Sequence, residues 1–165
     1  LWFLIGWQIM GIVYGSVINV FERYKEKAID VTFMSLQKYM QDFSHNNHVS
    51  LVCINQCGEC LLFVDEEFTQ NVTPFMDKDI RLYRYDKDVG GREFQPLPYF
   101  LADGQEEEVC FRYDIHPDGT RSEMIVKDGK DVYFFPSYFG SVQKYASIEK
   151  AVEQQAELAQ KVAEQ

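Results

Sequence analysis

The first 21 residues of the chain are apolar almost throughout and include no Asp, Glu, Lys or Arg. A helix of this length spans roughly 31 Å at about 1.5 Å per residue, which is close to the hydrocarbon thickness of a bilayer. Its small and aromatic residues suit close helix packing within a membrane: Trp2, Gly6, Trp7, Gly11 and Gly15. The pattern predicts a transmembrane helix over residues 1–21, and a buried core helix is the alternative.

Apolar residues recur with the period of a helix in the next part of the chain. They stand four, three, four and three residues apart, so that they share one face: Ile29, Phe33, Leu36, Met40 and Phe43. No proline interrupts residues 1–43. We therefore expect one continuous N-terminal helix, in which residues 1–21 cross the membrane and the amphipathic residues 22–43 pack on a globular core.

Residues 49–142 change to the pattern of an antiparallel sheet. Apolar runs at 49–54 and 60–64 flank a short polar link, which predicts a hairpin. Further β-rich runs follow, and turn residues separate them: 80–85, 109–115, 123–126 and 132–135. The expected fold class is α+β, with the long N-terminal helix packed on a small antiparallel sheet.

Residues 143–165 return to helical spacing and contain no glycine or proline. This pattern predicts a C-terminal helix. Its apolar stripe is thin and rich in alanine, so the helix is either a frayed extension or a short docking or coiled-coil helix.

Charge and composition narrow the classes of function. The net charge of −10 repels a phosphate backbone and argues against nucleic acid as a direct partner. Of the residues, 46% are hydrophobic and 15% aromatic, which is enough for one packed domain. The sequence contains no nucleophile elbow, zinc-protease motif, phosphate-binding loop or dinucleotide-binding motif. We expect no catalysis, no cofactor and no small-molecule substrate.

Four cysteines are the candidate chemical site: Cys53, Cys57, Cys60 and Cys110. Disulfides are the favoured interpretation, with one bond inside the predicted hairpin. Cys53 can lie opposite Cys60, whereas Cys57 and Cys60 form a C-x-x-C that can close on itself, and the sequence does not choose between them. A zinc site that adds His45 or His48, a redox motif and plain thiols remain alternatives.

The order of elements and three short motifs resemble type IV pilin-like proteins, namely minor pseudopilins of type II secretion or minor type IV pilins. The start of the sheet, Val-Ser-Leu-Val-Cys at 49–53 with a second cysteine at Cys60, is similar to that of small-tip pseudopilins. Residues 111–120 contain a Pro-Asp-Gly turn like the family's hairpin, and 139–142 resemble its Phe-Gly-Ser ending.

The resemblance implies a non-catalytic structural subunit of a membrane-anchored secretion, pilus or DNA-uptake filament. Such a subunit assembles through its N-terminal helix with other pilin-like subunits and inner-membrane assembly proteins. A subunit of another secretion or motility complex with one membrane span, or a metal or redox domain built on the cysteines, is the alternative function.

The resemblance also implies a location in the bacterial inner membrane, with a single pass and the globular domain in the periplasm. Arg23, Lys25 and Lys27 follow the apolar segment directly, and by the positive-inside rule these bases favour the cytoplasm. We expect the periplasmic location that the resemblance implies.

Overall fold

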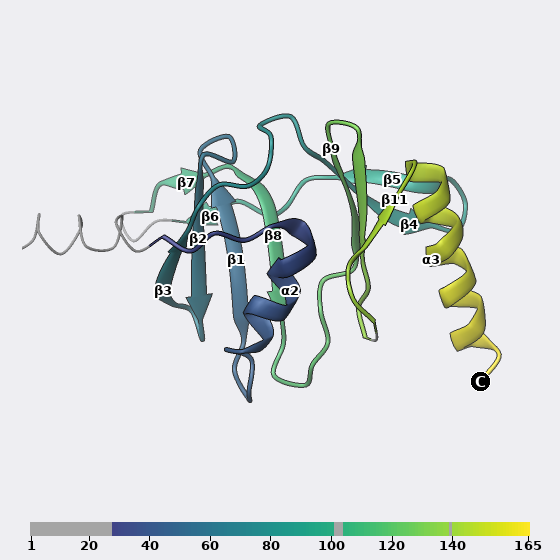
Figure 1. Cartoon of the computed structure of the whole chain (residues 1–165), viewed down its shortest axis with the longest axis horizontal. Coiled ribbons are helices and arrows are strands. Elements are labelled where there is room, and N and C mark those ends of the chain that lie inside the picture. Colours follow the sequence, from purple (N-terminus) through teal and green to yellow (C-terminus); the bar gives the residue numbers. More distant parts are fainter. Residues whose placement is uncertain (1–27, 101–103, 139) are drawn as a thin grey trace, which may run out of the picture.

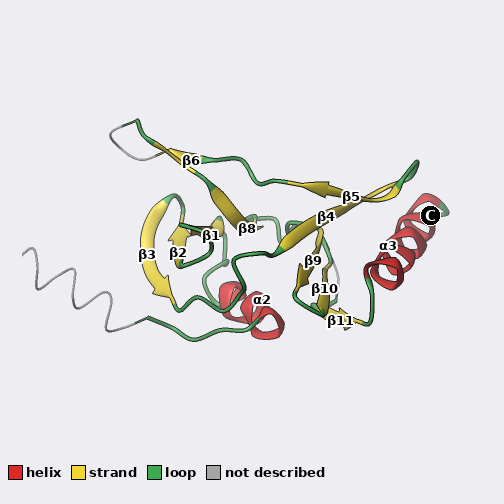
Figure 2. Cartoon of the chain, turned by 90° about the horizontal axis from the view of Figure 1, so that it is seen from above, coloured by secondary structure: helices red, strands yellow, loops and turns green. Residues whose placement is uncertain are grey.

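The structure is a computed structural model that describes residues 28–100, 104–138 and 140–165. Two antiparallel sheets stand side by side, with one helix at their junction and a second helix on the outer face of one sheet (Figure 1; Figure 2). The helices are α2 (Phe33–Gln41) and α3 (Ile148–Ala163). Because α2 is short, the sheets contribute most of the packed interior.

The first sheet has the strand order β3-β2-β1-β8. Its strands are β1 (Val49–Ile54), β2 (Glu59–Val64), β3 (Glu67–Val72) and β8 (Val109–Ile115). The second sheet has the order β11-β10-β9-β4-β5. Its strands are β4 (Arg81–Asp86), β5 (Gly90–Phe94), β9 (Met124–Asp128), β10 (Asp131–Phe135) and β11 (Gln143–Tyr145). A separate pair joins β6 (Tyr99–Phe100) to β7 (Glu106–Glu107).

Alternation along the strands explains how each sheet divides its side chains between two faces. Phe111, Tyr113 and Ile115 of β8 are buried in the main core, and the residues between them are half-buried. In β9, Met124 and Val126 enter the same core, while Ile125 faces a second cluster that includes Ala151 of α3. The second sheet is therefore covered on both faces, by the main core and by α3.

Helix α2 begins at Phe33 because Thr32 caps it. The Thr32 hydroxyl accepts a hydrogen bond from the Ser35 N–H at 3.2 Å, and the Ser35 hydroxyl accepts one from the Thr32 N–H at 2.8 Å. Phe33, Leu36 and Met40 on the buried face contribute to a core that also contains residues of both sheets. The helix thus closes the junction between the sheets (Figure 2).

The predicted α+β fold with a long N-terminal helix is wrong. Residues 28–32 are not helical, and Ile29 instead forms a parallel bridge with Val72 of β3. The Ile29 N–H donates to the carbonyl of Asn71 at 3.1 Å, and the Ile29 carbonyl accepts from the Thr73 N–H at 2.9 Å. Ile29 and Phe43 still pack against the core, but from either side of the nine-residue helix α2.

The predicted single-pass location in the inner membrane is also corrected, together with the description of the chain as a pilin-like membrane protein. Within residues 28–100, 104–138 and 140–165, no helix is both long and apolar enough to cross a membrane. The longer of the two helices, α3, has 16 residues and a charged outer face. The predicted span over 1–21, with Trp2, Gly6, Trp7, Gly11 and Gly15, lies outside the described residues.

Helix α3 docks on the second sheet with its first half only. Ala151 and Gln155 are buried, and Ile148 and Val152 pack beside them. The second half extends beyond the sheet, where Val162 is 76% exposed (Figure 1). The helix is therefore a docking helix over its first turns and a solvent-exposed extension beyond them.

We predict that Gln37 of α2 stabilises the segment between β10 and β11. Its amide nitrogen donates to the carbonyl of Gly140 at 3.1 Å, and its amide oxygen accepts from the buried Val142 N–H at 3.1 Å. In the Gln37→Leu variant, the Gly140 carbonyl and the Val142 N–H both lose their hydrogen bonds to this side chain. The free energy of unfolding of the variant should therefore fall by about 1–3 kcal/mol. Urea denaturation measures the change, and the exposed Gln41→Leu variant, at the end of the same helix, should stay within about 0.5 kcal/mol of the wild type.

Candidate functional site

All four cysteines of the chain are bonded in pairs. Cys53 lies opposite Cys60 in the β1–β2 register, with 4.1 Å between their Cα atoms, and the two form a disulfide inside the hairpin. Cys57, in the link between these strands, bonds to Cys110 of β8, with 5.7 Å between the Cα atoms. The cysteines therefore join three strands of the first sheet to one loop. Across the described ranges, no three His, Cys, Asp or Glu side chains are arranged to hold a metal ion.

The link between β1 and β2 has an unusual backbone. Three consecutive residues other than glycine adopt the left-handed conformation, with φ of 57° at Asn55, 55° at Gln56 and 62° at Cys57. Each such residue costs roughly 1–2 kcal/mol, somewhat less for asparagine. One disulfide lies at the base of this loop and the other at its tip, so covalent bonds hold a conformation that the residues do not favour.

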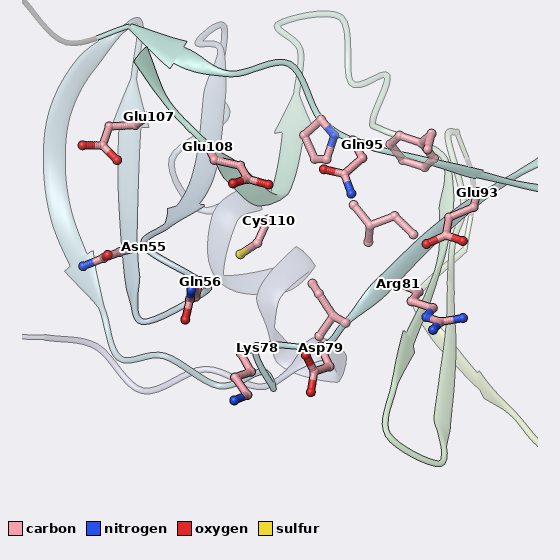
Figure 3. Close-up of a pocket in the computed structure, with 14 residues that line it drawn as sticks. Asn55, Gln56, Lys78, Asp79, Arg81, Glu93, Gln95, Glu107, Glu108 and Cys110 are labelled. Carbon is pink, nitrogen blue, oxygen red and sulfur yellow. The ribbon is translucent and has the colours of Figure 1, made fainter. Parts of the chain in front are cut away.

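This loop forms one wall of a cleft of about 530 Å³ between the two sheets (Figure 3). Asn55 and Gln56 line one side of the cleft, with Cys110 near them, and the Asn55 amide points outward from that side in Figure 3. The remaining walls come from the start of β4, the end of β5 and the residues around β7. Six charged side chains line the cleft: Lys78, Asp79, Arg81, Glu93, Glu107 and Glu108.

The charged side chains of the cleft have no ionic partner among the described residues, and the same is true of many exposed charges elsewhere, such as Lys87, Glu149 and Lys161. A few charged side chains outside the cleft do pair, such as Lys144 with Asp131 at 3.0 Å and Arg92 with Asp86 at 3.4 Å. The cleft therefore offers unpaired charges and amides, in contrast to the mostly apolar lining of small-molecule pockets.

A second hollow of about 290 Å³ shares Phe94 and Pro96 with the cleft. The guanidinium carbon of Arg84 lies 4.0 Å from the centre of the Phe94 ring, which is a cation–π contact. Arg112 and Asp114 line the same hollow. Phe94 and Pro96 thus form a ridge between a larger and a smaller hollow.

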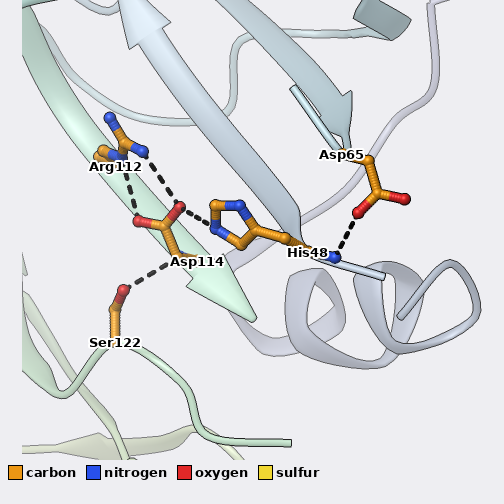
Figure 4. Close-up of polar contacts among 5 residues, drawn as sticks. All are labelled: His48, Asp65, Arg112, Asp114 and Ser122. Atoms are coloured by element: carbon orange, nitrogen blue, oxygen red, sulfur yellow. Dashed lines mark hydrogen bonds and ion pairs between the residues drawn. The ribbon is translucent and has the colours of Figure 1, made fainter. Parts of the chain in front are cut away.

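Asp114 is the centre of a polar cluster at the end of β8 (Figure 4). Its carboxylate accepts hydrogen bonds from Arg112, Nε to Oδ2 at 3.0 Å and Nη2 to Oδ1 at 3.3 Å. His48 Nε2 lies 3.0 Å from Oδ1, and the His48 ring stacks on the ring of His116 with 5.1 Å between centroids. Burial alone raises the pKa of Asp114, but hydrogen bonds and the charge of Arg112 outweigh it, so the pKa lies below its ordinary value.

The serine near this cluster is not arranged as a nucleophile. The Ser122 hydroxyl accepts a hydrogen bond from the Asp114 backbone N–H at 3.0 Å, and it lies on the far side of Asp114 from His48 (Figure 4). Nucleophilic catalysis needs the base within reach of the hydroxyl. The cluster therefore joins β1 to β8 and carries no catalytic pair.

Sequence reasoning found the cysteines but missed both the cleft and the Asp114 cluster. No motif links His48 to Asp114, the carboxylate 66 residues away that it contacts. His45 is exposed, and the structure does not bring it into the cysteine cluster. The cleft residues come from four separate segments, so no spacing in the sequence marks them.

We predict that the two disulfides differ in their contributions to stability. In the chain-entropy account, a cross-link between residues 53 apart contributes about 4 kcal/mol, and one between residues 7 apart about 2.5 kcal/mol. Cys57→Ala/Cys110→Ala should therefore lose more free energy of unfolding than Cys53→Ala/Cys60→Ala. Each double variant removes two sulfur atoms, so the two variants are matched to each other. Guanidinium denaturation measures the free energy of unfolding of both. The opposite order would contradict the entropic explanation.

We also predict an acid-dependent contribution from Asp114. Its pKa is lowered from 3.8 in the folded protein, so its stabilisation is present above about pH 4 and is lost as the pH falls through the folded pKa. Asp114→Asn should be less stable than wild type at pH 7, by about 1–3 kcal/mol. The difference should shrink between about pH 4 and pH 2 when urea midpoints are measured. The matched change of the exposed Asp30 to Asn should alter the free energy of unfolding at pH 7 by less than about 0.5 kcal/mol.

Comparison with known proteins adds no relative from which a function can be transferred. The resemblance to pilin-like proteins therefore stays a prediction, because no known family model, curated protein or solved structure matches this chain.

Proposed function

We propose that this protein is a non-catalytic binding domain that holds an extended segment of a partner protein in the cleft between its two sheets. The observation that carries this proposal is the left-handed run at Asn55, Gln56 and Cys57, which two disulfides hold beside the cleft. Unfavourable backbone conformations persist where the surroundings impose them, and they concentrate at functional sites.

The chemistry of the loop matches a polypeptide. Asn55 and Gln56 are exposed, and each side-chain amide has both donors and an acceptor, as a peptide backbone has. Because the disulfides hold the loop backbone, that backbone loses little conformational freedom when the loop binds. The loop backbone is therefore preorganised, and its side-chain amides can hydrogen-bond with the main chain of a partner segment.

The size and lining of the cleft support the same class of ligand. Its volume of about 530 Å³ lies in the usual range of ligand sites, roughly 300–1,000 Å³. Its apolar lining is limited to a few side chains, among them Ile80, Phe94 and Pro96, and the rest is charged or amide. A short polar stretch of polypeptide fits such a surface better than an apolar small molecule.

The disulfides support a binding role over a metal or redox role for the cysteines. Cys53, Cys57 and Cys60 are each no more than 2% exposed, which places most of the sulfur chemistry out of reach of a partner. Both bonds hold the loop, and such bonds persist in an oxidising environment. Assembly into a pilin-like filament stays a prediction from the sequence, since its contacts would fall on residues 1–21, outside the described residues.

The test is a selection of random dodecapeptides on the oxidised protein, followed by affinity measurements with the best binders. We expect Gln56→Gly to raise the free energy of unfolding by about 1 kcal/mol, because glycine adopts the left-handed conformation without strain. The same change should weaken peptide binding about fivefold, as the loss of one hydrogen bond implies. A variant that gains stability and loses affinity separates the function of the loop from its effect on folding.

The matched control is Glu66→Gly, because Glu66 is also left-handed, with φ of 69°, but does not line the cleft. This variant should gain stability without any change in peptide affinity. The proposal fails if the selection yields no binder, or if the binders attach equally well to the Gln56→Gly protein.

A further inference from the structure

We infer that the segment held in the cleft is of mixed charge with an excess of basic residues: its lysine or arginine side chains contact Glu107 and Glu108, and an acidic side chain contacts Lys78 or Arg81. This inference rests on the proposed function, because it specifies the partner of the same cleft.

The first support is the balance of unpaired charge. Four carboxylates and two bases line the cleft, and none of them has an ionic partner among the described residues. A ligand that supplies more positive than negative charge neutralises this surface. The net charge of −10 over the whole chain attracts the same kind of partner at long range and repels phosphate backbones.

The second support is the position of the charges around the cleft (Figure 3). Glu107 and Glu108 lie on the rim opposite Lys78, and Arg81 lies between Lys78 and Glu93 on a third side. A uniformly basic segment would meet Lys78 and Arg81 as like charges, which disfavours it. A segment with bases directed to one rim and an acid to the other avoids this repulsion.

Extended polypeptides carry such a pattern readily. Successive side chains of an extended chain point to opposite sides. A segment whose main chain contacts Asn55 and Gln56 can therefore direct basic residues toward the glutamate rim and an alternate acidic residue toward the opposite rim. The loop amides recognise the main chain, and the rim charges select the sequence.

The experiment uses dodecapeptides recovered from the selection, labelled with fluorescein and measured by fluorescence anisotropy on the folded, oxidised protein. We expect the recovered peptides to be enriched in lysine or arginine together with at least one acidic residue. Glu107→Lys/Glu108→Lys should weaken binding about tenfold or more, and raising the salt concentration should weaken wild-type binding. Peptides with every charge inverted should bind this double variant better than they bind the wild type.

The matched control is Glu66→Lys/Glu67→Lys, which changes the net charge equally at exposed positions outside the cleft, in the turn before β3 and at its first residue. It should weaken binding less than about threefold, because only long-range attraction is reduced. Circular dichroism and thermal melting establish that both double variants are folded before affinities are compared.

The outcomes separate this inference from the proposed function. Recovered peptides that respond to Gln56→Gly but show no basic enrichment and bind Glu107→Lys/Glu108→Lys normally would overturn the charge assignment alone. Equal losses in the two double variants would also overturn it, because general charge attraction would then explain the binding. Failure to recover any peptide, or indifference to Gln56→Gly, would overturn both proposals.

Discussion

The bond between Cys57 and Cys110 is the constraint on which the candidate site depends. It ties the loop that follows β1 to β8, two segments that are 53 residues apart in the chain. The bond between Cys53 and Cys60 fixes the base of the same loop across β1 and β2. With its base and its tip both held, the loop keeps a left-handed backbone and forms one wall of the cleft.

Polar groups have two different roles in this molecule. Around Asp114, hydrogen bonds from Arg112 and the contact with His48 leave the carboxylate fully engaged, and this cluster stabilises the pairing of β1 with β8. Around the cleft, charged side chains have no ionic partner within the described ranges. Paired charges contribute to the fold, whereas unpaired charges on a rigid surface are available to a partner.

The N-terminal prediction failed for a reason that particular residues show. The spacing of Ile29, Phe33, Leu36, Met40 and Phe43 is helical, and three of these side chains do pack from α2. However, Thr32 caps the helix and leaves Ile29 free to pair with β3. Helical spacing of apolar residues indicates which side chains are buried, but it does not establish that each of them lies in a helix. Ile29 is packed from an extended segment beside the edge of the first sheet.

Local patterns by themselves determined several of the strands and most of the C-terminal helix, but not β3, β5 or β11. Strand β11 occupies the start of the segment 143–165, which was predicted to be helical. The runs at 49–54 and 109–115 match β1 and β8, and helical spacing without glycine or proline marks Ile148–Ala163, because period and turn chemistry act between near neighbours in the chain. Only the tertiary structure decided the division into two sheets, the partner of Cys57 and the position of the cleft. These depend on which strands become neighbours, and that is a property of the packing of the whole chain.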